Sequence, residues 1–104
     1  MPVFFLVRAR IADGVVKGDF DRWYGDEHMP DALRTFKAKR AWRAWSDVDP
    51  SVHYAFYEFD SMAAARSIEG SDGLRRLVAD FDGTWGDRVV RSRDFIQTAE
   101  KSEG

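Results

Sequence analysis

Two segments of this chain have the composition of β-strands and are apolar on both of their alternating faces. In residues 3–11 (VFFLVRARI), Val3 and Phe5 lie on one face and Phe4 lies on the other. Residues 52–59 (VHYAFYEF) repeat the pattern with aromatic side chains on either side. A strand of this kind must be covered on both faces. The sheet that contains these strands therefore needs helices on one side and a further cover on the other.

The segments that follow these two strands have helical periodicity. Apolar residues recur at steps of three and four over residues 18–36, but Pro30 lies inside this stretch. Since proline cannot continue a helix undisturbed, we expect a kinked or two-part helix that breaks near His28. A second helical region covers residues 62–69 and, after a Gly-Ser-Asp-Gly turn, residues 74–85.

Two further strands complete the pattern, over residues 38–47 and 88–96. The resulting order is β-α-β-β-α-β, which is the split βαβ arrangement of the ferredoxin-like fold. We therefore predict an α+β protein with an antiparallel four-stranded sheet and helices on one face. The chain of 104 residues is the length of one domain and shows no linker or repeat, so we assign residues 1–104 to a single domain.

The face of this sheet that turns away from the helices is predicted to be apolar. It would carry Phe4, Leu6, Tyr54 and Phe56. Burying apolar surface contributes roughly 25 cal/mol per Å², so covering several such side chains favours association strongly. A second copy of the chain is the simplest cover, and we expect a homodimer that joins through this open sheet face.

Composition excludes several classes of site. The chain has no cysteine, which removes disulfides, thiolate nucleophiles and cysteine-based metal sites. Its longest apolar run, Val3 to Val7, spans five residues, whereas a membrane helix needs about twenty and the apolar core of a signal peptide needs roughly seven or more. We therefore expect a soluble, cytoplasmic protein.

One cluster of residues resembles a known superfamily. The pattern Phe20-x-x-Trp23-Tyr24-x-x-Glu27-His28-x-Pro30, together with residues 40–45 and 54–60, resembles the dimeric α/β-barrel superfamily in its EthD-like and stress-responsive branches. The resemblance implies that two ferredoxin-like subunits join sheet to sheet and that each keeps a pocket between its helices and its sheet. Related proteins include polyketide cyclases, lactone isomerases and cofactor-free monooxygenases, so the fold alone does not define a reaction.

The two histidines are the candidate catalytic residues. His28 shares a helical face with Tyr24, and the resemblance places a pocket histidine at this position. It can be a structural residue that ties the helix to a strand, or a general acid or base at the mouth of a pocket. His53 can serve as a second pocket base. No acidic residue stands at a recognisable metal-ligand spacing from either histidine, so we expect no metal and no cofactor.

Several aromatic residues and one arginine are candidates for contacts with a ligand. The aromatic residues suit either a core and interface or a pocket for a flat, apolar molecule, in which a tyrosine would supply a phenolic hydrogen bond. Arg43 can stabilise an enolate or a carboxylate in such a pocket, or it can point to solvent. The candidate substrate-binding residues are Trp23, Tyr24, Arg43, Tyr54, Tyr57 and Trp85.

A nucleic-acid-binding module is the competing hypothesis from a different class. Residues 52–59 are similar to the RNP1 strand of RNA-recognition motifs, with Tyr54 and Phe56 as stacking residues. However, Val52 and His53 stand where that motif has a basic residue and a glycine, and the net charge of the chain is -2. These features argue against RNA binding.

The function that we predict is therefore the handling of a small apolar or aromatic molecule by a dimeric α/β-barrel protein. If the protein is an enzyme, we expect a cofactor-independent cyclase or isomerase, or a monooxygenase. The alternative is a non-catalytic ligand-binding or oligomerisation module.

Overall fold

Strand β1 lies in the interior of a four-stranded antiparallel sheet. In this computed structural model, which describes residues 1–104, the strand order is β2-β3-β1-β4. Strands β2 and β4 are therefore the edges of the sheet. The strands are β1 (Val3–Ile11), β2 (Arg40–Trp45), β3 (Val52–Phe59) and β4 (Val89–Gln97).

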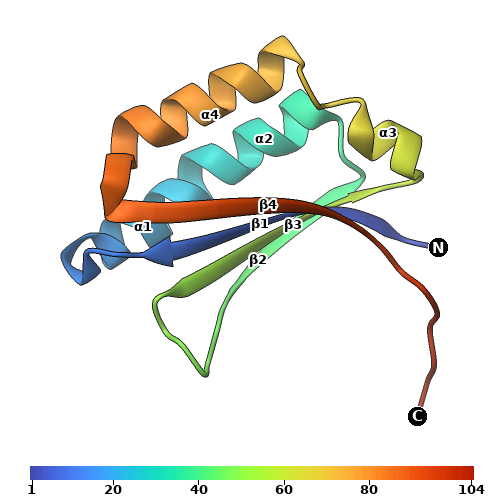
Figure 1. The fold of residues 1–104 in the computed structure, drawn as a ribbon, viewed down its shortest axis with the longest axis horizontal. Coiled ribbons are helices and arrows are strands. Elements are labelled where there is room, and N and C mark those ends of the chain that lie inside the picture. Colours follow the sequence, from blue (N-terminus) through green and yellow to red (C-terminus); the bar gives the residue numbers. More distant parts are fainter.

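All of the helices lie on one side of this sheet (Figure 1). Helices α2 and α4 run across the sheet, and the short helix α3 lies near one end of it. The predicted ferredoxin-like α+β fold is confirmed. No helix combines the length and the apolar character that crossing a bilayer requires. The helices are α1 (Lys17–Trp23), α2 (Met29–Phe36), α3 (Met62–Arg66) and α4 (Asp72–Trp85).

The first helix is in two parts, as predicted, but a π-helical turn rather than a break joins them. The backbone stays in the right-handed helical region from Trp23 to Met29, and the N–H of Met29 donates to the carbonyl of Tyr24, five residues earlier. Pro30 explains the change of register, because it has no N–H with which to continue the ordinary hydrogen-bond ladder. Helices α1 and α2 are thus joined by the π turn Tyr24–His28.

The second helical region divides differently from the sequence prediction. Ser61 caps α3 by accepting a hydrogen bond from the Ala64 N–H at 3.1 Å, and α3 then ends early, at Arg66. Ser71 caps α4 through the N–H of Leu74 at 3.1 Å, so this helix begins inside the segment predicted as a turn. Serine is a preferred N-cap residue because its hydroxyl satisfies a backbone N–H that has no helical partner.

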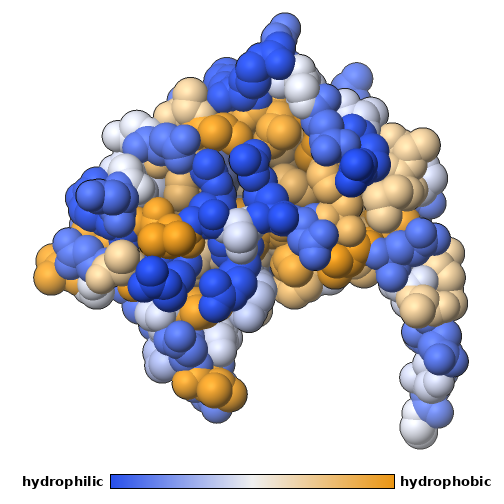
Figure 2. All heavy atoms as spheres, in the orientation of Figure 1, coloured by the Kyte–Doolittle hydropathy of each residue, from blue (hydrophilic) through white to orange (hydrophobic).

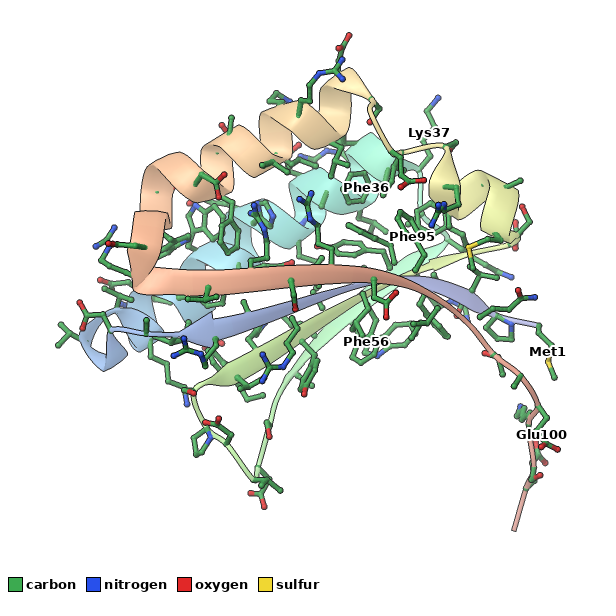
Figure 3. All side chains as sticks on the ribbon, in the orientation of Figure 1. Met1, Phe36, Lys37, Phe56, Phe95 and Glu100 are labelled. Atoms are coloured by element: carbon green, nitrogen blue, oxygen red, sulfur yellow. The ribbon has the colours of Figure 1, made fainter.

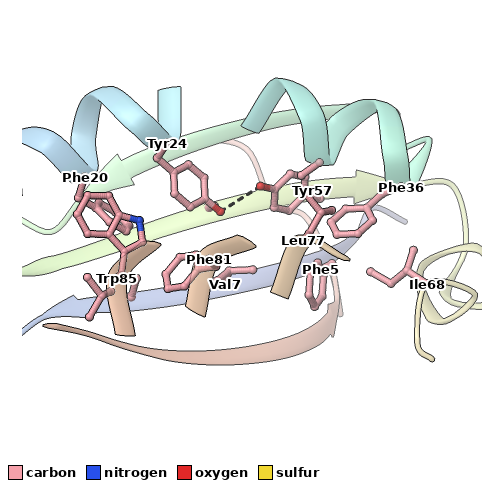
Figure 4. Packing of buried hydrophobic residues seen from close by; sticks show 14 of the residues in the cluster. Phe5, Val7, Phe20, Tyr24, Phe36, Tyr57, Ile68, Leu77, Phe81 and Trp85 are labelled. Atoms are coloured by element: carbon pink, nitrogen blue, oxygen red, sulfur yellow. Dashed lines mark hydrogen bonds between the residues drawn. The ribbon is translucent and has the colours of Figure 1, made fainter. Parts of the chain in front are cut away.

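The hydrophobic core fills the space between the helices and the sheet. Alternate residues of β1 point into it, and α4 contributes Leu77, Phe81 and Trp85. Phe20 from α1 and Tyr24 from the π turn complete the packing across the sheet (Figure 4). A pocket between the helices and the sheet would therefore be lined by residues of this core.

The opposite face of the sheet carries an aromatic cluster. The rings of Trp42 and Phe56 are stacked with their centroids 5.4 Å apart, and Phe4 meets the Trp42 ring edge-on at 5.5 Å. Figure 3 shows Phe56 on the side away from the helices, whereas Phe36 lies between the helices and the sheet. Trp42 is 40% exposed. We call this the open-face cluster; its members are Phe4, Leu6, Trp42, Tyr54 and Phe56.

Candidate functional site

A small cavity lies between the helices and the sheet. Its volume is about 30 Å³, which is room for a water molecule or two rather than for a ligand. It adjoins a larger groove of about 460 Å³, with which it shares Phe5, Leu74 and Arg93. The larger volume falls within the usual range of small-molecule pockets. The cavity is lined by Phe5, Val7, Tyr24, His28, Phe36, Tyr57, Leu74, Leu77, Val78, Phe81, Arg91 and Arg93.

Two buried tyrosines meet in the wall of this cavity. The hydroxyl oxygens of Tyr24, from the π turn, and Tyr57, from β3, are 3.0 Å apart and share a hydrogen bond (Figure 4). Burial raises the pKa of Tyr24 to about 12, and it raises the pKa of Tyr57 well above its ordinary value. Both phenols are therefore neutral at physiological pH.

His28 lies at the edge of the same cavity. Its ring stacks on the Trp23 indole with centroids 4.5 Å apart and meets the Tyr24 ring at 4.9 Å. Burial lowers the pKa of His28 from 6.5 to about 4, although the nearby Asp31 carboxylate acts in the opposite direction. The imidazole is consequently neutral near pH 7 and is able to accept a proton.

On its other side His28 borders an acidic surface groove of about 260 Å³. Asp31 of this groove is held by Arg76, whose guanidinium donates to both carboxylate oxygens at 2.9 and 3.0 Å. Those hydrogen bonds keep the pKa of Asp31 below its usual value. His28 thus separates the inner cavity from a charged, solvent-facing groove lined by Trp23, Glu27, Asp31, Asp80 and Thr84.

Two arginines from edge strand β4 complete the cavity. Arg91 and Arg93 pair with Ala9 and Val7 of β1, so they project toward the helices. The Arg91 side chain is 14% exposed and donates to Asp82 at 3.1 Å. Burial lowers the pKa of Arg91, with Asp82 opposing the shift. Arginine keeps its charge under such conditions, so the cavity has a cationic wall.

His53 belongs to a separate cluster around Asp21. Arg43 donates to the Asp21 carboxylate at 2.7 Å, and the Trp45 indole N–H donates to the same oxygen at 2.8 Å. The Arg43 guanidinium also lies 3.4 Å from Nε2 of His53. Burial and, to a smaller extent, the charge of Arg43 lower the pKa of His53 to about 4. This histidine is completely buried, and its Nδ1 has no hydrogen-bond partner.

The structure therefore brings together only some of the residues that the sequence suggested. Tyr24, His28 and Tyr57 line one cavity, with Trp23 stacked behind the imidazole. Four other candidates do not line it. His53 and Arg43 form the cluster around Asp21, Trp85 packs in the core against Phe20, and Tyr54 lies on the open face.

Sequence reasoning missed the two arginines of the cavity and the acids of the outer groove. The signal for the arginines was present, because Val89, Arg91, Arg93 and Phe95 alternate along one strand and must share its inward face. Asp31 and Asp80 come from different helices, and their proximity to His28 depends on how α2 and α4 pack. No three His, Asp or Glu side chains are grouped so that they could hold a metal ion.

Comparison with known proteins identifies the fold but not a sequence family. The sequence matches no family model and no curated protein. Among solved structures, an EthD family protein from Bacillus halodurans superposes with a TM-score of 0.74 at 13% identity, covering 94% of this chain and 99% of that one. The two chains therefore share a fold. At such low identity the likeness extends to the fold alone.

Two further structures are similar to this chain over nearly its whole length. SnoaB, a cofactor-independent oxygenase from Streptomyces nogalater, superposes in its N63A form with a TM-score of 0.70 at 10% identity, covering 96% of this chain and 95% of that one. A proposed antibiotic biosynthesis monooxygenase from Deinococcus radiodurans gives a TM-score of 0.69 at 8% identity, covering 97% and 96%. The EthD-like resemblance of the sequence is thus confirmed at the level of the fold.

Proposed function

We propose that this protein binds a small apolar or aromatic molecule between its helices and its sheet, and that His28 exchanges a proton with that molecule. The observation that carries this proposal is the cavity, which places His28 and the Tyr24–Tyr57 hydroxyl pair around one apolar space. Apolar pockets with a few convergent polar groups and shifted pKa values are typical of ligand sites.

The proposed chemistry uses the side chains of the protein itself. The neutral imidazole of His28 takes a proton from a carbon next to a carbonyl group, which leaves an enolate and an imidazolium. A tyrosine hydroxyl donates a hydrogen bond to the enolate oxygen. Return of the proton to another carbon completes an isomerisation. In a cyclisation the enolate carbon instead attacks a second carbonyl, and the imidazolium returns its proton to the resulting alkoxide. Negative charge that develops beside His28 favours its protonated form.

A ligand requires more room than the inner cavity alone provides. The cavity of about 30 Å³ adjoins the groove of about 460 Å³ at Phe5, Leu74 and Arg93. Leu74 lies in the first turn of α4 and is only partly buried. We expect its side chain to rotate so that the groove and the cavity form one pocket.

An oxygenase is the second candidate function. It is supported by the likeness to SnoaB, which is a cofactor-independent oxygenase. In this version His28 removes a proton in the same way, and the substrate carbanion then forms a C–O bond with molecular oxygen. The imidazolium returns its proton to the peroxide, which gives a hydroperoxide of the substrate. Oxygen uptake that accompanies turnover distinguishes this candidate from an isomerase or a cyclase.

We further propose that the protein forms a homodimer through its open-face cluster. The stacked Trp42–Phe56 pair and the Phe4 ring form a continuous aromatic surface on a face that no helix covers. Packing two copies of this surface against each other removes it from water. The same surface would otherwise offer rings for base stacking, so dimerisation also argues against an RNA-binding role.

The proton-transfer proposal is tested with 2-tetralone, an aromatic ketone whose acidic C–H groups exchange with D₂O. NMR measures the exchange rate with the native protein, with His28→Gln and with free imidazole at equal concentration. We expect the exchange rate to be higher with the native protein than with free imidazole. His28→Gln should lose at least a hundredfold of this acceleration, since general bases contribute about 10²–10⁴ in rate. Binding of the ketone without accelerated exchange would instead favour the non-catalytic ligand-binding alternative.

A further inference from the structure

The cavity has an unbalanced charge. Arg91 and Arg93 are its charged lining residues, and no carboxylate is among the side chains that face it. Arg91 is partly neutralised from outside by Asp82, whose own side chain is 60% exposed. Its guanidinium also lies over the Phe81 ring, 4.4 Å from the ring centroid. Arg93 makes no side-chain hydrogen bond and no ion pair. The positive charge of Arg93 therefore has no partner within the protein, at the place where the apolar cavity meets the groove.

The adjoining groove carries two acids, Glu69 and Asp94, but neither forms an ion pair with Arg93. Arg66 is paired there with Glu69 at 2.7 Å, and its guanidinium lies over the Phe95 ring at 5.0 Å. Asp94 also lines the groove, but it follows Arg93 along β4 and forms no ion pair with it. In Figure 2, hydrophilic residues gather over β4 in the middle of the face shown, with hydrophobic residues on either side. The hydrophilic residues over β4 thus lie between two apolar regions.

The tyrosine pair adds a hydrogen-bond donor to the same cavity. Each hydroxyl has one proton, and the Tyr24–Tyr57 hydrogen bond uses only one of the two. Neither hydroxyl makes another hydrogen bond within the protein, so the second proton is left for whatever occupies the cavity. The positive charge of Arg91 also acts on Tyr24, where it opposes the effect of burial on the phenol.

We propose that this pocket selects an anionic ligand, namely an apolar molecule that carries a carboxylate or an enolate oxygen. The anionic oxygen lies against Arg91 and Arg93 and accepts the free tyrosine proton, while the apolar body occupies the groove beside Leu74 and Phe5. This inference rests on the proposed function, because it concerns the ligand of the same pocket.

The physical basis is that the partly desolvated guanidinium of Arg91 binds an anion more strongly than it binds water. Arginine presents several N–H donors in one plane, which suits the two oxygens of a carboxylate. Arg91 uses one of these donors for Asp82. Charge-assisted hydrogen bonds of this kind discriminate by about ten- to a hundredfold against a neutral group of the same shape.

The test compares two probes of nearly identical shape, naphthalene-2-carboxylate and naphthalene-2-carboxamide. Binding to the full chain at pH 7 is measured by protein NMR titration. We expect the carboxylate to bind at least tenfold more tightly than the carboxamide. Arg93→Gln and Arg91→Gln should weaken carboxylate binding much more than carboxamide binding, and so remove this preference. Arg34→Gln, which removes the same charge from an exposed position on α2, should keep the preference.

The outcomes separate this inference from the proposed function. Equal binding of both probes by the native protein would preserve the pocket and overturn the anion preference. An equal loss of preference in Arg34→Gln would also overturn it, because net charge alone would then explain the result. If neither probe binds, the proposed pocket itself fails and the inference fails with it. Arg93 is exposed, so Arg93→Gln remains informative even if Arg91→Gln does not fold.

Discussion

The imidazole of His28 stacks on the indole of Trp23, with ring centroids 4.5 Å apart and planes inclined by 20°. In an ordinary α-helix two residues five apart point about 140° away from each other, so such rings would not meet. The π turn Tyr24–His28 changes this geometry by adding one residue to the turn. The local distortion of the helix is therefore what holds the candidate base against an aromatic wall.

Replacing Trp23 with alanine should raise the pKa of His28 from about 4 toward 6.5. Burial is the main cause of the low value, and removal of the indole admits water to the ring. Stacking on an aromatic face by itself favours the protonated imidazole, so it opposes the effect of burial. An NMR titration of the histidine ring signals measures the pKa of His28 in both proteins. The His53 signals, from a ring among Phe20, Tyr24 and Trp45, provide the internal control. An unchanged His28 titration would contradict this explanation.

The buried His53 should make the stability of the protein depend on pH. Its pKa is lowered to about 4 in the folded state and is about 6.5 in the unfolded state. The unfolded chain therefore binds the proton more readily. The contribution of His53 to the free energy of unfolding is fully present above pH 6.5 and is lost as the pH falls toward 4. For this fully buried group the loss is on the order of 3 kcal/mol. Urea denaturation between pH 7 and pH 4 measures it, and His53→Gln should show a flatter dependence. Equal slopes in the two proteins would be inconsistent with a buried, neutral His53.

Substitution of Gly25 with alanine should disturb the cluster around Asp21. A Cβ at this position would lie 2.8 Å from the Arg43 guanidinium, so this group, which also forms the ion pair with Asp21, would have to shift. We expect a destabilisation of about 1 kcal/mol, which is the usual contribution of one hydrogen bond. In an Arg43→Ala background this cost should vanish, because the clashing group is gone. Denaturation of the four proteins of this double-mutant cycle measures the coupling.

The matched control is Gly83→Ala in α4. An added Cβ there meets no atom within 4 Å, so the substitution should stabilise the protein by up to about 1 kcal/mol through helix propensity. If Gly25→Ala also stabilised the chain, the contact between the added Cβ and Arg43 would not be destabilising, and the explanation would be wrong.

Most of the fold was predictable because side-chain alternation and helical period are local properties. The strands over residues 3–11 and 52–59 occur as predicted, since β-branched and aromatic residues favour extended structure. The π turn was not predicted. Pro30 signals only that the hydrogen-bond ladder is disturbed, and a break and a π turn are both consistent with that signal.

The candidate site was predictable only in part. The helical face shared by Tyr24 and His28 placed both at the cavity. The separation of His53 from that cavity depends on Arg43 and Asp21, which come from different elements and form their ion pair only in the folded chain. The volume of the cavity likewise depends on packing between distant segments, and no sequence pattern encodes it.

The open-face cluster gives the last prediction, which concerns assembly. We expect the native protein to be a dimer in solution and Trp42→Glu to shift it toward the monomer, because a carboxylate would be buried without a partner in the interface. Val48→Glu is the matched control, since Val48 is 96% exposed in the loop between β2 and β3, away from the cluster. Sedimentation equilibrium over a range of concentrations measures the dissociation constant, which should rise at least a hundredfold in Trp42→Glu and remain unchanged in Val48→Glu. Circular dichroism confirms that both variants are folded. A native protein that stays monomeric at high concentration would mean that the aromatic face has another cover or none, and the proposed dimer would be wrong.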